Sequence, residues 1–183
     1  MVITEETVRE AITQMCYSFL IGNYYIMEHI KEKFMKLYLA GSLFNEAEVA
    51  QRKREGMLLR ENFPELDIFN PIDQPFNEDK SSLPTPITIF DGDTQAVREC
   101  DIFIADLTND DPGVMVELGI AIQCGNKIII GINSDIRLAD ASKYDIPTYG
   151  MNHYVLGGVL KHGHFVRSFN EAMEVLKQCL NNK

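Results

Sequence analysis

Two acidic side chains in the second half of the chain have the spacing of groups that could do chemistry together. Asp111 stands directly before Pro112, and Glu117 follows six residues later among apolar residues and glycine. An Asp followed by Pro is typical of a helix start, where Asp caps the free N–H groups and Pro occupies the first turn. Asp111 is therefore either a helix cap or a ligand-binding acid.

Glu117 has an unusual place on the helix that Asp111 would begin. With about 100° of rotation per residue, it falls at the edge of the apolar face of Val114 and Leu118, away from the polar side near Gln123. A carboxylate with apolar neighbours has to be paired, protonated or placed against a cavity. This favours a functional carboxylate, with a solvent-reaching or ion-paired side chain as the alternative.

A second group of acids lies upstream. Asp91 and Asp93 flank a glycine, and Asp101 and Asp106 stand at the two ends of a strand-like segment. Either Asp91 or Asp93 could cap a helix. Magnesium is disfavoured here, because the chain has neither a phosphate-binding loop nor EF-hand spacing. We expect no cofactor.

A pair of carboxylates suits the cleavage of an N-glycosidic bond. One can attack the anomeric carbon and hold the sugar covalently while the other protonates the departing base, as in retaining glycosidases. A sugar without a 2-hydroxyl develops positive charge at this carbon more easily, so carboxylates suffice without a metal. Attack by a second base then gives transfer, and attack by water gives hydrolysis.

The elements that must position these acids alternate between strand and helix from residue 36 onward. This rhythm predicts an α/β fold: one doubly wound parallel sheet of the flavodoxin or Rossmann kind. Residues 71–86, with four prolines, are expected to form a loop, and most of 133–167 is expected to be irregular. The expected strands are 37–40, 67–69, 102–105 and 127–132, and the expected helices are 45–62, 88–99, 112–124 and 168–180.

The segments that follow the expected strands carry many of the acids and amides. In parallel sheets, ligands bind beyond the carboxyl ends of the strands. Residues 41–44, 70–74 and 106–113 are therefore expected to meet at one edge of the sheet.

The N-terminal region differs from the rest, because residues 4–33 are predicted to be helical with one apolar stripe. We expect two parts: an N-terminal helical extension over residues 1–35 and the α/β domain over residues 36–183. The extension carries no chemical motif and could cover the domain or contact another subunit.

Composition excludes several classes of protein. With 17 Lys and Arg against 27 Asp and Glu, the net charge of −10 disfavours a nucleic-acid partner. The chain has no apolar run of membrane-spanning length, and its acidic start is unlike a secretory signal, so a cytoplasmic location is expected. The four Cys form no CxxC pair and the four His have no metal spacing, so we expect neither zinc nor disulfides.

Over roughly residues 36–180, the chain resembles the nucleoside 2-deoxyribosyltransferase family. No single motif is specific, but their order and spacing together are. The matching segments are Leu37-Tyr38-Leu39-Ala40-Gly41-Ser42-Leu43-Phe44, Asn70-Pro71-Ile72-Asp73, Asp93 with Arg98-Glu99-Cys100-Asp101, Asp106, Asp111-Pro112-Gly113 with Glu117-Leu118-Gly119, Asn152 with Gly157-Gly158-Val159, and Ser168-Phe169 with Ala172.

The resemblance implies catalytic roles for three residues. Glu117 matches the nucleophile that becomes deoxyribosylated, and Tyr38 matches the tyrosine whose hydroxyl orients that carboxylate. Asp93 matches the position that meets the nucleobase and assists proton transfer, a role that Asp91 could take instead. As an alternative, Tyr38 is simply a core residue of its strand.

The resemblance also implies a set of binding residues. Asp111 matches the acid that binds the sugar 3′-hydroxyl, and Asn152 matches an amide that reaches the 5′-hydroxyl from a neighbouring subunit. Phe44 and Gln74 fall where the family lines its base pocket. Asn152 could instead belong to a turn, and Phe44 could be a hydrophobic staple of a helix.

The implied activity is the transfer of 2-deoxyribose between nucleobases through a covalent deoxyribosyl-glutamate. The partners would be a deoxynucleoside and a free nucleobase, without nucleic acid or membrane, in a homo-oligomer with shared active sites. Two other functions stay open: a deoxynucleoside 5′-monophosphate N-glycosidase, which Ser42 could serve as a phosphate ligand, and a non-enzymatic module that binds a nucleotide-like ligand.

Overall fold

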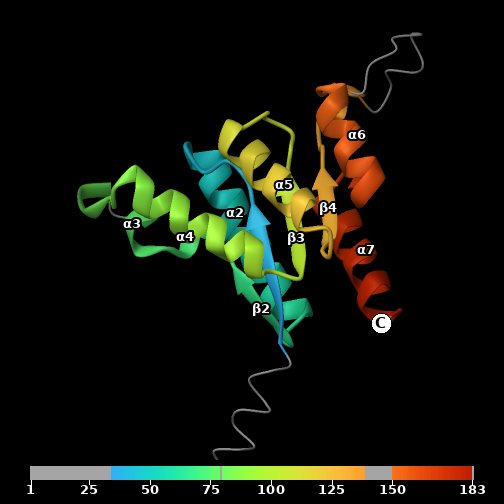
Figure 1. Ribbon diagram of the computed structural model, residues 1–183, viewed down its shortest axis with the longest axis horizontal. Coiled ribbons are helices and arrows are strands. Elements are labelled where there is room, and N and C mark those ends of the chain that lie inside the picture. Colours follow the sequence, from blue (N-terminus) through green and yellow to red (C-terminus); the bar gives the residue numbers. More distant parts are fainter. Residues whose placement is uncertain (1–33, 79, 139–149, 183) are drawn as a thin grey trace, which may run out of the picture. The chain divides into compact units, whose positions relative to one another are not determined.

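The protein was analysed as a computed structural model that describes residues 34–78, 80–138 and 150–182 (Figure 1). The predicted helix over residues 4–33 lies outside the described residues, so the N-terminal extension and its boundary stay predictions. None of the helices in the described ranges combines the length and apolar character needed to cross a membrane.

The described residues contain a five-stranded sheet in the order β2-β1-β3-β4-β5, in which all neighbouring strands are parallel. This confirms the prediction of a doubly wound parallel sheet. Most strand residues are branched or aromatic and buried, as expected for a sheet covered on both faces. The strands are β1 (Met35–Ala40), β2 (Leu66–Phe69), β3 (Ile102–Asp106), β4 (Ile128–Ile132) and β5 (His164–Val166).

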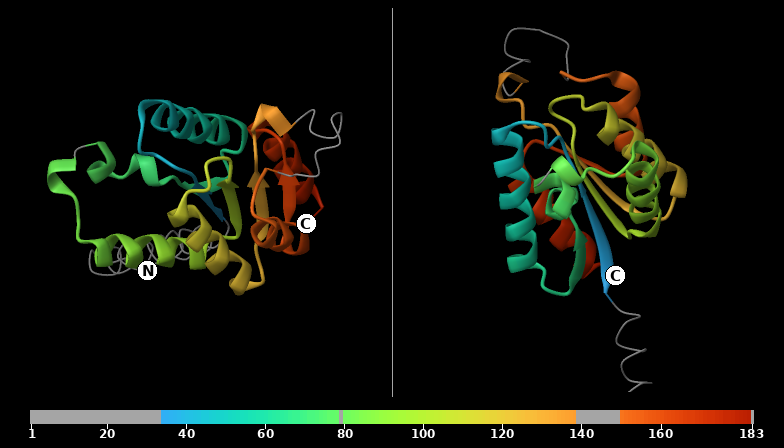
Figure 2. Two further views of the ribbon diagram at one scale, coloured as in Figure 1. Left: turned by 90° about the horizontal axis from the view of Figure 1, so that it is seen from above. Right: turned by 90° about the vertical axis from the view of Figure 1, so that its left-hand side faces the viewer.

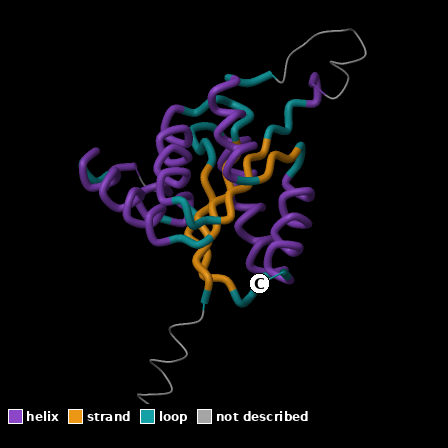
Figure 3. Tube along the Cα trace, turned by 45° about the vertical axis from the view of Figure 1, so that its right-hand side comes forward, coloured by secondary structure: helices purple, strands orange, loops and turns teal. Residues whose placement is uncertain are grey.

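Alternate strand residues feed two separate cores, one on each face of the sheet. Leu37, Leu39 and Ile104 face α2 (Glu46–Asn62) and α7 (Phe169–Asn181). Tyr38 and Phe103 face the other layer, made of α4 (Pro86–Glu99), α5 (Pro112–Cys124) and α6 (His153–His162). The right-hand view of Figure 2 shows α2 and α7 on one side of the strands, and Figure 3 shows the strands between the helices.

The helices begin at capping residues that are visible in the sequence. Asp111 caps α5 with Pro112 in the first turn, as predicted, and Asn45 and Ser168 cap α2 and α7. The expectation that Asp91 or Asp93 caps a helix is wrong. Thr85 caps α4 just before Pro86, so both acids lie in the interior of this helix.

The structure contains elements that the sequence patterns did not indicate. The proline-rich segment forms short helices, η1 (Pro71–Asp73), α3 (Pro75–Glu78) and η2 (Lys80–Ser82). Downstream, α6 and β5 occupy a region expected to be irregular, and η3 (Ile136–Leu138) follows β4.

The turn between α6 and β5 explains part of this error, because it depends on packing. A Cβ on Gly163 would lie 2.2 Å from the Ile129 carbonyl oxygen, so only glycine fits there. A glycine read in isolation indicates a loop, whereas here it allows β5 to lie beside β4.

Candidate active site

The three loops after β1, β2 and β3 meet around one cavity of about 480 Å³, together with α4 and α5. This volume is within the usual range for small-molecule sites, and its position beyond the carboxyl ends of the strands is where parallel sheets bind ligands. The lining residues are Gly41, Leu43, Phe44, Pro71, Phe76, Asn77, Leu83, Ile89, Asp93, Asp111, Gly113, Val114 and Glu117.

The side chain of Glu117 points toward the sheet and forms a hydrogen bond with a buried tyrosine. The Tyr38 hydroxyl donates a hydrogen bond of 2.7 Å to Oε1 of Glu117. The Tyr38 ring is fully buried and stacks between Phe69 and Phe103, its neighbours on β2 and β3, at centroid distances of 5.2 and 5.7 Å. The stacked rings of Phe69 and Phe103, on the neighbouring strands, therefore fix the position of the Tyr38 hydroxyl. This hydroxyl in turn orients the Glu117 carboxylate through the hydrogen bond.

Burial raises the pKa of both members of this pair. It raises the pKa of Glu117 to about 7, an effect that the hydrogen bond from Tyr38 opposes and the negative charges of Asp93 and Asp111 reinforce. Burial and the adjacent Glu117 also raise the pKa of Tyr38. Tyr38 therefore remains a hydrogen-bond donor, and Glu117 can exchange its proton near neutral pH.

Asp93 reaches the same cavity from α4, the helix that packs against α5. Its side chain is partly buried, and burial raises the pKa of Asp93. The cavity therefore contains two acids with raised pKa values on facing helices, the arrangement that general acid and nucleophile pairs use.

Asp111 lines the cavity while it caps α5. Its Oδ1 accepts a hydrogen bond of 3.0 Å from the Val114 N–H. Capping and ligand binding are therefore compatible, because a carboxylate has two oxygens and several lone pairs.

The rest of the lining is mostly apolar, and most of it was not among the predicted site residues. Phe76, Leu83 and Ile89 come from the proline-rich segment and the first turn of α4. Phe44, which was predicted, contributes to the same cavity and is 78% exposed. The available signal was the presence of large apolar residues in a loop that should have been polar.

Four predicted residues are not among the described residues that line the cavity. Tyr38 is fully buried and contacts the cavity only through its hydrogen bond to Glu117. Asp91 is exposed on α4. Gln74 is the C-cap residue that follows η1, two residues before the lining residue Phe76. Asn152 is exposed and caps α6, where its Oδ1 accepts from the Tyr154 and Val155 N–H groups. Of the two neighbouring acids, Asp93 and not Asp91 therefore lines the cavity.

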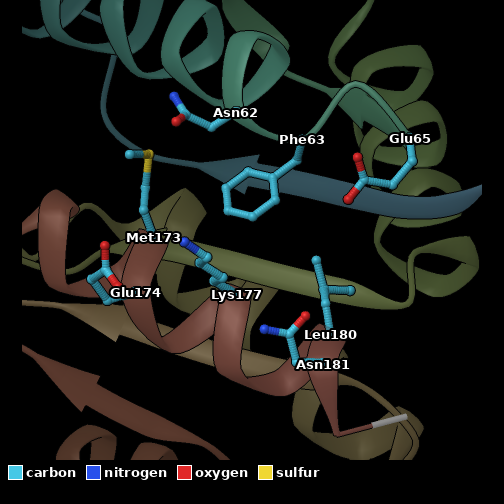
Figure 4. Close-up of a pocket in the computed structure, with 8 residues that line it drawn as sticks. All are labelled: Asn62, Phe63, Glu65, Met173, Glu174, Lys177, Leu180 and Asn181. Carbon is cyan, nitrogen blue, oxygen red and sulfur yellow. The ribbon is translucent and has the colours of Figure 1, made fainter.

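A second, smaller cavity of about 260 Å³ lies on the other face, between the end of α2 and α7 (Figure 4). Phe63, Met173 and Leu180 form its apolar part, and its rim includes Glu65 and Lys177. Asn62 to Glu65 precede β2, so this cavity is at the end of the sheet opposite to the usual ligand edge.

Metal chemistry has no evident ligand set here. In the part of the chain that the structure describes, no group of three or more His, Cys, Asp or Glu side chains could hold a metal ion. The carboxyl groups of the cavity can transfer protons or act as nucleophiles.

Comparison with known proteins points to one family. The family model for nucleoside 2-deoxyribosyltransferase matches residues 37–176, which include every residue that lines the cavity. An uncharacterized protein of Ureaplasma parvum is 28% identical over 150 residues, covering 79% of this chain and 95% of its own length.

Solved structures show the same fold. A conserved protein from Enterococcus faecalis has 25% identity and a TM-score of 0.68, with 79% of this chain and 98% of that chain covered. The 2-deoxyribosyltransferase from Leishmania mexicana has 21% identity and a TM-score of 0.56, with coverages of 76% and 95%. With the family match over most of its length, the chain belongs to the nucleoside 2-deoxyribosyltransferase family and is an enzyme that acts on N-glycosidic bonds.

Proposed function

We propose that the protein transfers 2-deoxyribose from one nucleobase to another by two displacements at Glu117. The observation that carries this proposal is the 2.7 Å hydrogen bond between Tyr38 and Glu117 at the wall of a largely apolar cavity. It gives the carboxylate a fixed direction and, with burial, a pKa of about 7. A nucleophile needs both orientation and an accessible ionised form.

In the first step, an oxygen of ionised Glu117 attacks C1′ of the bound deoxynucleoside. The bond between C1′ and the base nitrogen breaks, and its electron pair stays with the base. The carboxyl proton of Asp93 passes to the departing base, so the base leaves neutral and Asp93 becomes a carboxylate. The product is a deoxyribosyl ester of Glu117.

In the second step, a nitrogen of an incoming base attacks C1′ and the ester bond breaks. Glu117 regains its negative charge, and Asp93 takes the proton from the attacking nitrogen. The enzyme returns to its starting state, as microscopic reversibility requires for a residue that acts first as acid and then as base. No external oxidant, reductant or metal enters this balance.

The walls of the cavity support transfer over hydrolysis. Phe44, Phe76 and Leu83 offer flat or branched apolar surface on which a nucleobase can pack. A base held there would exclude water from the ester and take its place as the attacking group. This supports the transferase over a hydrolase of the same fold.

The polar groups of the cavity support a nucleoside over a nucleotide. Among the described lining residues none is Lys, Arg or His, and three are acids. The Ser42 hydroxyl, the candidate phosphate ligand, donates a 2.7 Å hydrogen bond to Glu48 instead. The Glu48 carboxylate already accepts the hydrogen bond that Ser42 can donate. A 5′-phosphate would also be repelled by the acidic residues that line the cavity.

The decisive experiment uses thymidine with adenine and identifies the products by chromatography. Formation of deoxyadenosine with release of thymine is expected. Free deoxyribose without deoxyadenosine would show a nucleoside hydrolase, and unchanged thymidine and adenine would contradict the proposed transfer.

The intermediate can be tested without an acceptor. Mass spectrometry of the protein after incubation with thymidine alone should show one added deoxyribosyl group, located on Glu117. Glu117→Gln should show none, whereas Asp91→Asn, at an exposed acid outside the cavity lining, should be labelled like the unmodified protein.

A further inference from the structure

A buried cluster of charges lies beneath the cavity and has no part in the displacement steps. Arg52 and Glu55, one turn apart on α2, are each only 2% exposed. The Arg52 Nη2 lies 2.8 Å from Oδ2 of Asp106 and 3.1 Å from Oε2 of Glu55. One guanidinium thus joins α2 to the last residue of β3.

The same guanidinium touches the turn that follows β1. Its Nη1 lies 3.5 Å from the Ala40 carbonyl oxygen. A Cβ added to Gly41 would lie only 2.0 Å from Nη1, so the Gly41 backbone rests directly on Arg52. Gly41 also lines the cavity, so Arg52 is one layer behind the cavity wall.

Asp106 extends this connection into the loop that leads to Asp111. Its Oδ1 accepts hydrogen bonds from the N–H and the hydroxyl of Thr108, at 3.0 and 2.6 Å. Through Asp106, Arg52 therefore restrains the β3–α5 loop as well as the β1–α2 turn. These two segments carry Gly41 on one side of the cavity and Asp111 on the other.

Stability alone does not account for this arrangement. Among the described residues, the buried Nε of Arg52 has no hydrogen-bond partner. Oε2 of Glu55 forms the ion pair with Arg52 but no hydrogen bond. Burial also raises the pKa of Glu55, even though Arg52 is adjacent. Buried ion clusters with unsatisfied atoms are often no more stable than apolar residues of the same volume.

We propose that Arg52 is a positioning residue, which sets the separation of the Gly41 turn and the Asp111 loop so that a deoxynucleoside fits between them. This inference rests on the proposed function of the cavity. The Tyr38–Glu117 pair is held by the strands and the aromatic stack, not by Arg52. Arg52 is therefore expected to govern substrate binding and alignment, and to leave the ionisation of Glu117 unchanged.

The test compares Arg52→Lys with a variant in which the whole cluster is neutral, Arg52→Met/Glu55→Gln/Asp106→Asn. Lys keeps the charge but cannot reach three partners at once, and the neutral variant leaves no buried charge unpaired. Arg54→Met, at an exposed arginine on the same helix, is the matched control. For each folded protein, KM, kcat and the pH dependence of kcat/KM are measured with thymidine and adenine.

We expect Arg52→Lys and the neutral variant to lower kcat/KM by about 10- to 100-fold, the size of effect that small misplacements of a substrate produce. Most of the loss should appear as a higher KM, with the acid limb of the pH profile unchanged and Arg54→Met like the unmodified enzyme. Unchanged KM and kcat in folded Arg52→Lys would overturn the positioning role, as would a shifted acid limb. Lack of any product from the unmodified enzyme would contradict the proposed function instead.

Discussion

In the proposed mechanism, Glu117 has to lose its proton before it can attack, whereas Asp93 has to keep one. The negative charge of Asp93 is among the causes that raise the pKa of Glu117. The ionisation of Glu117 therefore depends on whether Asp93 carries its proton. The productive form has the proton on Asp93.

The first prediction concerns the protons of these two acids. In the unmodified enzyme, kcat/KM should rise on the acid side as Glu117, with a pKa of about 7, ionises, and should fall on the alkaline side as Asp93 loses the proton that it must deliver. Asp93→Asn removes a negative neighbour, so the pKa of Glu117 should fall and the acid limb should move to lower pH. The maximal rate should fall by about 10²- to 10⁴-fold, because Asn cannot deliver a proton.

A pH–rate profile of both proteins checks this prediction. As a control, a deoxynucleoside whose base leaves as a stable anion should lose less activity in Asp93→Asn. An acid limb that stays in place or moves to higher pH would show that Asp93 does not act on Glu117.

The second prediction concerns the stability cost of the buried Glu117. Its pKa is about 7 in the folded protein and about 4.5 for an ordinary glutamate, so folding becomes less favourable as pH rises between these values. Glu117→Gln removes this cost. Relative to the unmodified protein, it should be unchanged in stability near pH 4.5 and more stable by about 2–3 kcal/mol above pH 7.

Thermal unfolding of the two proteins at several pH values measures this difference. A stability gap that is equal at all pH values would mean that Glu117 does not titrate between them. Loss of stability at high pH would mean that its carboxylate is paired in the folded state.

At the scale of elements, the cavity depends on the turn between β1 and α2. Gly41→Ala should force the Arg52 guanidinium out of its place, since the new Cβ would lie 2.0 Å from Nη1. Because Asp106 and Glu55 hold this side chain, the strain should cost about 1–3 kcal/mol of stability. Both the melting temperature and the turnover of thymidine should fall.

Gly157→Ala is the matched control, because a Cβ at this exposed position on α6 would contact no neighbouring atom of the described residues within 4 Å. It should raise stability by about 0.5–1 kcal/mol through helix propensity. A Gly41→Ala protein as stable and active as the original would show that Arg52 moves aside without consequence.

At the scale of the whole molecule, the prediction is that Asn152 acts in the site of another copy of the chain. Its side-chain oxygen is used to cap α6, so its amide nitrogen is the group that would meet a substrate hydroxyl. Asn152→Ser should keep the cap but lose the amide, and should raise the KM for thymidine as much as Asn152→Ala does. The protein should form a homo-oligomer in light scattering.

The comparison of the two variants separates these roles. If only Asn152→Ala has an effect, the residue is a cap and nothing more. A strictly monomeric protein with full activity would contradict a shared site.

The sequence by itself determined the elements whose signals are local. Branched residues in short runs predicted the four longer strands, and Asn45, Asp111 and Ser168 predicted three helix starts. The carboxylate of Glu117 was also recognisable, because a charged residue on an apolar helix edge requires an explanation. Each of these features depends on neighbours within a few residues.

The tertiary structure decided what depends on residues far apart in the chain. β5 has only three residues, so its pairing with β4 rather than its own pattern makes it a strand. The sequence of α2 is typical of a charged amphipathic helix, yet its charged residues Arg52 and Glu55 are buried because the end of β3 supplies Asp106. The apolar wall of the cavity likewise arises only where three loops meet, since burial and pairing are properties of the folded chain and not of local spacing.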